Sequence, residues 1–127
     1  MAGYSVDIEK ATLQNEFFRQ VLFTGKHMQL VVMTLKPGED IGKEVHDHVD
    51  QFIRVEAGTG ESVMDGETTA LSDGMSIVIP AGAEHNVTNT SSSEPMRLYT
   101  LYSPPNHPDG TIHKTREEAM KAEEEGH

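Results

Sequence analysis

Short apolar segments separated by turn residues run through the middle of the chain. Between the segments lie Gly, Asp-Gly and Pro-Ala-Gly turn signals, which supply the positive φ angles that tight hairpins need. Short strands at this regular spacing, with no helical pattern among them, predict an all-β sandwich or barrel. The expected strands are residues 17–24, 28–35, 51–57, 61–65, 68–71, 76–80, 85–89 and 96–103.

Helical patterns are confined to the two ends of the chain. Residues 7–15 suit a short helix or a loop. Residues 115–125 predict a firmer helix, because Thr115 can cap it and Glu118, three residues later, can complete a capping box. Alternating charges and the lack of a broad apolar stripe indicate that this helix is peripheral. The methionines expected to fill the core are Met28, Met33, Met64, Met75 and Met96.

Composition narrows the class of protein. The 127 residues suit one domain, residues 1–127, and the absence of cysteine excludes disulfides and thiolate metal sites. No segment resembles a signal peptide and no apolar run approaches the ~20 residues that cross a bilayer. We therefore expect a cytoplasmic protein without membrane contacts. The net charge of −11 disfavours nucleic acid as a partner, and the glutamates near the C-terminus predict a solvated helix face or tail.

Two histidines stand one residue apart in the stretch EVHDHVDQF. In a strand, His46 and His48 would point to the same face, and neutral imidazole is a common ligand for transition metals. A solvent-facing pair is the alternative. Downstream, Gln51 alternates in phase with Ile53 and Val55, which predicts that its amide faces the interior. A buried amide needs a polar partner, and a metal or a water would serve.

A second segment carries a further histidine. Residues 74–89 contain an expected strand, a tight turn at residues 80–82, and then His85, in phase with Val87 and Asn89. This phase predicts that His85 also faces inward. Taken alone, His85 could equally be a turn histidine that is bonded to the backbone.

This second segment resembles the second motif of the cupin family, usually written G-x5-P-x-G-x2-H-x3-N. Every fixed position is matched, by Gly74, Pro80, Gly82, His85 and Asn89.

The earlier segment resembles the first cupin motif, G-x5-H-x-H-x3,4-E-x6-G. His46, His48 and Gly58 match it, and Gln51 stands in the acidic position. The segment departs from the motif in two further ways. Only two residues separate His48 from Gln51, and Gly42 lies closer to His46 than the motif requires.

The resemblance covers roughly residues 28–104 and implies a single jelly-roll-type cupin barrel with short terminal helices. It is strongest to small single-domain bacterial cupins that are labelled mannose-6-phosphate isomerase-like. It also implies one divalent transition metal (zinc, iron, manganese, nickel, cobalt or copper) held by His46, His48, Gln51 and His85. Gln51 could instead be a neighbour of the ligands, and Glu44, in phase with His46, could supply the oxygen ligand.

The function that the resemblance implies is a metal-dependent enzyme of isomerase, lyase or dioxygenase type, acting on a small polar or anionic molecule. The alternative is a non-catalytic module that binds a small ligand or a metal. The candidate general acids or bases are Tyr99, Tyr102 and His113.

Two expectations concern the rest of the surface. The edge strand near residues 17–23 makes a homodimer plausible, as in many cupins. The histidines outside the motifs are expected at the surface, with His113 also able to fold over the barrel mouth; they are His27, His107, His113 and His127.

Overall fold

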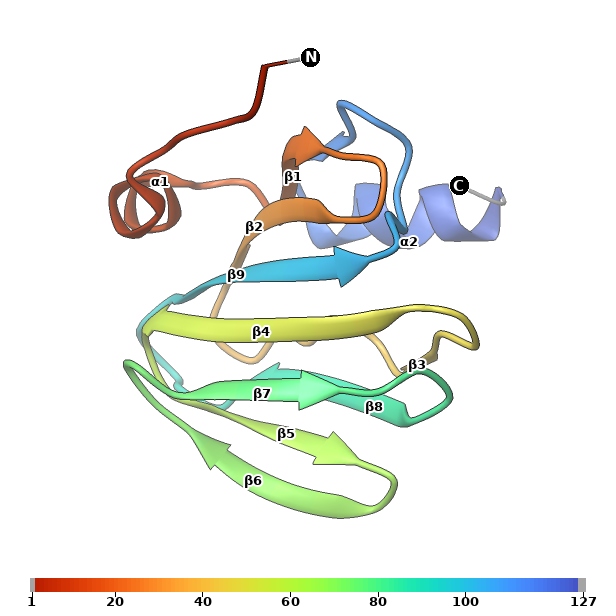
Figure 1. Cartoon of the computed structure of the whole chain (residues 1–127). Coiled ribbons are helices and arrows are strands. Elements are labelled where there is room, and N and C mark those ends of the chain that lie inside the picture. Colours follow the sequence, from red (N-terminus) through yellow and green to blue (C-terminus); the bar gives the residue numbers. More distant parts are fainter. Residues whose placement is uncertain (1, 126–127) are drawn as a thin grey trace.

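A computed structural model describes residues 2–125, so the prediction for His127 lies outside the described residues. Two antiparallel sheets face each other and enclose the core (Figure 1). The larger sheet has the order β10-β1-β2-β9-β4-β7 and the smaller has the order β3-β8-β5-β6. This arrangement confirms the predicted all-β, jelly-roll-type fold with short terminal helices.

The larger sheet contains β1 (Arg19–Thr24), β2 (Gln29–Leu35), β4 (Asp50–Ala57), β7 (Ser76–Ile79), β9 (Met96–Ser103) and β10 (Ile112–His113). The smaller sheet contains β3 (Glu44–Val45), β5 (Gly60–Met64), β6 (Glu67–Leu71) and β8 (Glu84–Asn89). All of the predicted strands are confirmed to within a residue or two. The strands β3 and β10 were not predicted, because two residues are too few to show an alternating pattern.

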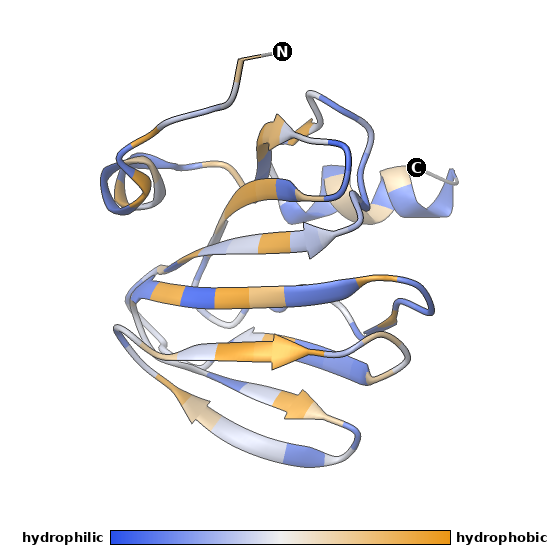
Figure 2. Ribbon diagram, viewed as in Figure 1, coloured by the Kyte–Doolittle hydropathy of each residue, from blue (hydrophilic) through white to orange (hydrophobic). Residues whose placement is uncertain are grey.

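Alternation along the strands builds the core. On β4, Gln51, Ile53 and Val55 are buried while the residues between them are only partly covered, as the sequence predicts. The same period on β9 buries every second residue from Met96 to Tyr102. Apolar residues therefore recur along the ribbons of both sheets, as Figure 2 shows, and their inward members form one continuous core.

The hairpin between β5 and β6 shows why turn residues predicted strand boundaries well. Asp65 and Gly66 both have positive φ, at 47° and 84°, which is the conformation of a two-residue hairpin turn with native twist. The pairing of Met64 with Glu67 closes this turn.

Helix α1 (Ile8–Gln14) begins after Asp7, whose carboxylate accepts a hydrogen bond from the amide of Lys10. Helix α2 (Arg116–Glu124) begins after Thr115, whose hydroxyl accepts from the amide of Glu118, as predicted. The reciprocal half of the capping box is different. The Glu118 carboxylate accepts from the amide of Lys114 instead of that of the cap residue.

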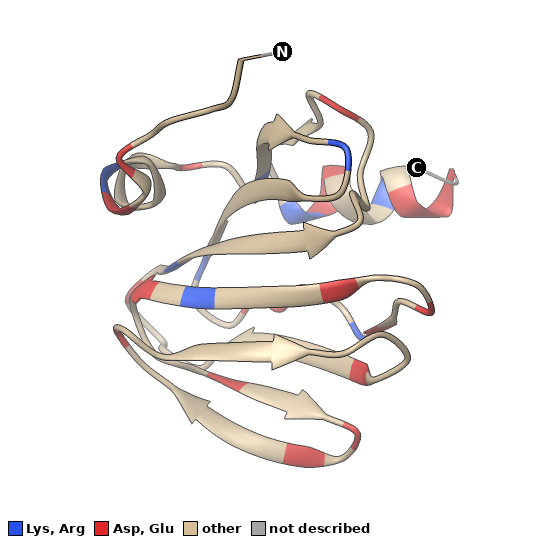
Figure 3. Ribbon diagram, viewed as in Figure 1, with Lys and Arg blue, Asp and Glu red and all other residues tan. Residues whose placement is uncertain are grey.

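The C-terminal helix is peripheral, as the sequence predicts, but it is firmly docked on the barrel. Ala119 is fully buried and belongs to the core, and Met120 packs against it. Arg116 also joins this helix to the barrel, because its guanidinium donates to the carboxylate and to the carbonyl oxygen of Asp40. One buried alanine, with the partly buried Met120 beside it and the Arg116 bonds, docks this helix without a broad apolar stripe. Its acidic residues remain exposed on the outer side (Figure 3).

Two other expectations change with the structure. Met33 and Met96 fill the core and Met64 packs beside it, but Met28 and Met75 are exposed. The edge of β1 is also only half open, since Arg19 and Gln20 pair with β10. Within residues 2–125, none of the helices is long and apolar enough to cross a bilayer.

Candidate functional site

The residues of the two sequence motifs meet at one end of the barrel. Gln51, near the start of β4, lies directly beside Tyr102, near the end of β9. His85, the second residue of β8, lies opposite them in the smaller sheet and pairs with Glu44 of β3. Gln51, Tyr102 and His85 are each at most 3% exposed. The two sheets therefore place four polar side chains at the same end of an apolar core.

Two backbone hydrogen bonds join the motifs. The amide of Gly82 donates to the carbonyl oxygen of His46 over 2.8 Å, and the amide of Ala81 donates to the carboxylate of Asp50 over 2.9 Å. The turn that offers these amides is closed by the bond from Ala83 to Pro80, and Gly82 has a φ of +91°. A glycine at this position is required by the backbone conformation of the turn.

The ring of His85 is oriented by the backbone. Its Nδ1 lies 3.0 Å from the carbonyl oxygen of Ala83, and because a carbonyl can only accept, Nδ1 carries the hydrogen. A neutral imidazole with its hydrogen on Nδ1 carries a lone pair on Nε2, and this is the form that binds a metal. Nε2 is buried and has no hydrogen-bond partner within residues 2–125. Histidine ligands of metals are commonly oriented in this way, by a hydrogen bond from the other ring nitrogen.

His46 stands between His85 and Tyr102. Its ring centroid lies 5.3 Å from that of His85 and 6.2 Å from that of Tyr102. Its Nε2 lies 3.3 Å from Oε2 of Glu44. Two donors that are each ~2.0–2.1 Å from one tetrahedral ion are separated by ~3.3 Å, so this pair has the spacing of two ligands of one metal.

Gln51 is buried as the sequence predicts. Its amide nitrogen donates to the hydroxyl of Thr100 over 3.0 Å, which leaves its Oε1 facing the interior. That oxygen is buried and, like Nε2 of His85, meets no hydrogen-bond partner in the described part of the chain. The amide of Gln51 can therefore offer an oxygen ligand without breaking an existing bond.

His48, the other predicted ligand, lies outside this cluster. The expectation that His46 and His48 share a face assumed that both lie in a strand. Strand β3 ends at Val45 and residues 46–49 form a turn, so the period-two argument does not apply there. His48 is exposed, whereas the side chain of His46 is 14% exposed. Over residues 2–125 no three His, Asp or Glu side chains are arranged closely enough to hold a metal ion on their own.

The pKa values of this cluster reflect its burial. Desolvation raises the pKa of Glu44, with Arg19 and His85 acting in the opposite direction. Desolvation lowers the pKa of His46, and the neighbouring His85 lowers it further. Glu123 acts in the opposite direction, and Arg19 has the smallest effect, which also lowers this pKa. Burial raises the pKa of Tyr102 to about 12, so its hydroxyl stays protonated and can donate a hydrogen bond.

Residues from the C-terminal segment line this end of the barrel. His107 Nε2 lies 3.4 Å from the Tyr102 hydroxyl, and burial lowers the pKa of His107 to about 3. His113 is buried beside Arg19. The expectation that these two histidines are surface residues is therefore wrong, although His113 does fold over the mouth. The reason is that residues 104–113 return across the barrel end instead of extending into solvent.

Tyr99, a predicted general acid or base, lies away from the cluster, whereas Arg19, which was not predicted, lies close to it. Tyr99 packs against Phe52 on the outer face of the larger sheet, so it lies outside the cluster. Arg19 was not predicted as a site residue, yet it is 1% exposed and its charge acts on most of the cluster. The available signal was its inward phase with Val21 in the expected strand.

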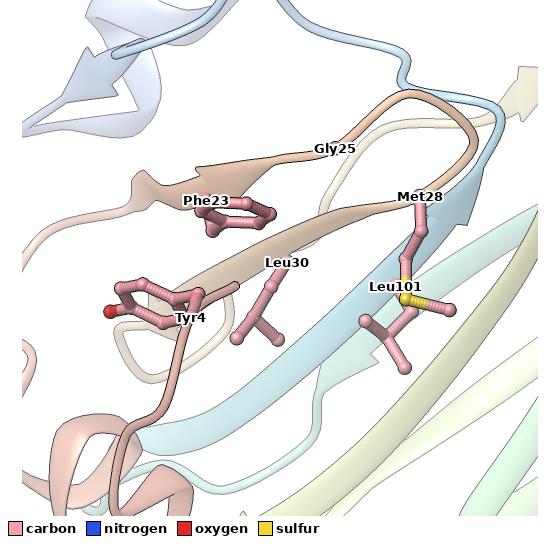
Figure 4. A pocket seen from close by; sticks show the side chains of 6 residues that line it. All are labelled: Tyr4, Phe23, Gly25, Met28, Leu30 and Leu101. Carbon is pink, nitrogen blue, oxygen red and sulfur yellow. The ribbon is translucent and has the colours of Figure 1, made fainter. Parts of the chain in front are cut away.

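A separate apolar pocket of about 240 Å³ lies on the outer face of the larger sheet (Figure 4). Tyr4 stacks on Phe23 at its rim, with ring centroids 5.2 Å apart. Leu30, Met28 and Leu101 complete the lining. The pocket shares no residue with the polar cluster inside the barrel.

Comparisons with known proteins agree with this architecture. The Cupin domain family matches residues 31–102. The chain is 47% identical to the uncharacterized protein YrkC of Bacillus subtilis, over 95% of this chain and 68% of that protein. It is 45% identical to the uncharacterized protein L612 of Acanthamoeba polyphaga mimivirus, over 86% of this chain and 70% of that protein.

A crystal structure of the Bacillus halodurans protein BH2720 is similar throughout. It is 44% identical, covers 94% of this chain and 95% of its own, and superimposes with a TM-score of 0.92. The two motifs, the paired sheets and these matches lead to one conclusion: the chain belongs to the Cupin domain family.

Proposed function

We propose that this protein binds one divalent transition metal inside the barrel mouth and acts as an enzyme on a small polar or anionic molecule. The observation that carries the proposal is the lone pair of His85 Nε2, which is aimed into the barrel by the bond to Ala83 and is buried without a partner. An unpaired buried polar atom costs free energy, and a metal ion offsets that cost.

The types of donor suit such an ion, and holding it would require these side chains to lie closer together than they do within residues 2–125. His46 and His85 supply imidazole nitrogens, Gln51 supplies a buried amide oxygen, and Glu44 lies at ligand spacing from His46. Nitrogen and oxygen donors of this kind suit zinc, iron, manganese, cobalt, nickel or copper. His48 stays a predicted ligand that requires the 46–49 turn to rotate inward. Glu44 takes its place in our proposal.

A bound ion of this type would polarise a substrate oxygen or activate a water molecule. The chain itself supplies a hydrogen-bond donor beside His46, because the Tyr102 hydroxyl remains protonated. His107 remains neutral and faces that hydroxyl, so it can hold Tyr102 in a fixed orientation. These two residues are the ones we assign to orienting the substrate.

The titratable groups around the two histidines favour an enzyme over a passive binding module. A non-catalytic binding module needs only apolar side chains around its ligand. Here Glu44, Tyr102 and His107, which are titratable, surround this end of the barrel. Isomerase, lyase and dioxygenase chemistry remain the candidate reactions. Membership of the cupin subgroup labelled mannose-6-phosphate isomerase-like is a proposal from the sequence. A cytoplasmic location is a second proposal of this kind.

Elemental analysis of the purified protein tests the metal. We expect near-stoichiometric metal in the wild type and its loss in His85→Ala and His46→Ala, since each change removes an imidazole ligand. His27→Ala is the matched control, because that histidine is exposed and far from the cluster in sequence. Unchanged metal content in both site variants would overturn the proposal.

A further inference from the structure

Arg19 is a buried positive charge without an ion-pair partner in the described part of the chain. The residue is 1% exposed, and no Asp or Glu oxygen among residues 2–125 lies within ion-pairing distance of its guanidinium. Its Nε is buried and has no hydrogen-bond partner in the same range. A buried charge of this kind is strongly unfavourable unless something with the opposite charge completes it.

The side chains that contact the guanidinium carry no charge, and the carboxylate of Glu44 acts on it only from beyond ion-pairing distance. The Nη1 atom of Arg19 donates to Nδ1 of His113 over 3.2 Å, and because a guanidinium can only donate, that ring nitrogen accepts and His113 is neutral. The guanidinium carbon lies 5.4 Å from the centroid of the Phe18 ring, a contact that orients the planar group. The guanidinium is therefore held in place, and its buried Nε–H lacks an acceptor among residues 2–125.

The guanidinium belongs to the same end of the barrel as the candidate metal centre. Its hydrogen bond to His113 ties it to the segment whose His107 lies 3.4 Å from the Tyr102 hydroxyl, and its charge acts on Glu44 and His46. A ligand that contacts Arg19 would consequently lie close to His46. This inference deepens the proposed function and rests on that end of the barrel being the ligand site.

We propose that Arg19 binds the carboxylate group of a small monoanionic organic ligand. A planar carboxylate matches the fork of a guanidinium with two parallel hydrogen bonds. A monoanion balances the single charge of Arg19. In the metal-free protein, which the test uses, a phosphate dianion would add an uncompensated negative charge near Glu44 and Glu123. A carboxylate is therefore favoured over a phosphate as the recognised group.

Thermal unfolding of chelator-treated protein tests this without the metal. Acetate is the probe, sodium chloride keeps the ionic strength constant, and acetamide serves as the neutral molecule of the same shape. At neutral pH we expect acetate to raise the Tm to a plateau and acetamide to leave it unchanged. In Arg19→Met the half-maximal acetate concentration should rise roughly tenfold or more.

Two variants complete the design. Arg54→Met removes a partly exposed guanidinium that is paired with Glu56, and it should respond to acetate as the wild type does. Arg19→Lys keeps the charge without the fork and should give an intermediate response, which keeps the test informative if Arg19→Met does not fold.

Three results would overturn the inference: a wild-type response equal to that of chloride, an Arg19→Met response equal to that of the wild type, or a larger Tm rise with inorganic phosphate than with acetate. Failure of the metal proposal would look different, because metal content would be unaffected by His85→Ala while the acetate response persisted.

Discussion

The backbone amide of Gly82 donates a hydrogen bond to the carbonyl oxygen of His46 over 2.8 Å. This bond links residues that are far apart in the chain, and it holds the turn after β7 against the segment after β3. Since one of the two residues is a candidate ligand and the other precedes His85 by only three positions, the conformation of the turn decides how the imidazoles face each other.

The turn at Gly82 should be sensitive to any side chain. Gly82→Ala places a Cβ on a residue with a φ of +91°, and such strain costs about 1–3 kcal/mol. We expect urea unfolding to show a loss of that size, together with a lower metal content. Gly3→Ala is the control, because Gly3 has no positive φ and open space around it. Equal stability of both variants would show that the turn tolerates the substitution.

Glu44 and His48 are the alternatives for the fourth side-chain donor, beside His46, His85 and Gln51. Glu44 lies 3.3 Å from Nε2 of His46, whereas His48 is exposed. We expect Glu44→Gln to weaken zinc binding by about tenfold or more, because it removes the charge of a donor, and His48→Gln to leave it unchanged. Competition with a fluorescent chelator measures both affinities. The reverse ranking would restore the histidine pair of the sequence motif.

Acidification should destabilise the fold through His107. Burial, helped by the charges of Arg19, His113 and His46, lowers its pKa to about 3, while an unfolded histidine titrates near 6.5. Between these two pH values, His107 binds a proton in the unfolded chain but not in the folded chain. The free energy of unfolding falls as the pH drops from about 6.5 towards about 3, by at most about 1.4 kcal/mol per pH unit from this residue.

The variant His107→Phe isolates this contribution. Its free energy of unfolding should fall less steeply than that of the wild type over the same pH window. His27→Phe changes an exposed histidine and should leave the slope as it is. If His107→Phe and the wild type lose stability in parallel, His107 is protonated in the folded protein.

The homodimer stays a prediction, and we expect it to form between two copies through the outer face of the larger sheet. Cross-strand pairing aligns a row of uncharged side chains over adjacent strands of that sheet, and part of this row lines the pocket of Figure 4. A two-fold contact along this row would keep the acidic surfaces of a chain with net charge −11 apart. The row is Phe23, Leu30, Leu101, Phe52 and Val78.

Light scattering at micromolar concentration tests the dimer. Leu101→Lys should convert it to a monomer, because a charge would be buried in the centre of the contact. Val63→Lys, at an exposed apolar position of the smaller sheet, should leave the mass unchanged. A monomeric wild type would refute this prediction.

The strands and their inward faces were predictable from the sequence, because alternation and turn chemistry act over a few residues. Gln51, Ile53 and Val55 are buried as their period requires, and so is His85. His48 shows the limit of that reasoning. A period of two assumes a strand, and at residues 46–49 the backbone turns instead.

By itself the sequence determined the fold, the inward phase of the motif residues and the family, since these follow from local patterns and from matched motif positions. Tertiary structure alone decided which polar groups meet. Arg19, His107 and His113 come to the barrel mouth because β10 and the segment before it return beside β1. Contacts between residues so distant in the chain depend on how the sheets close, and no local pattern encodes that.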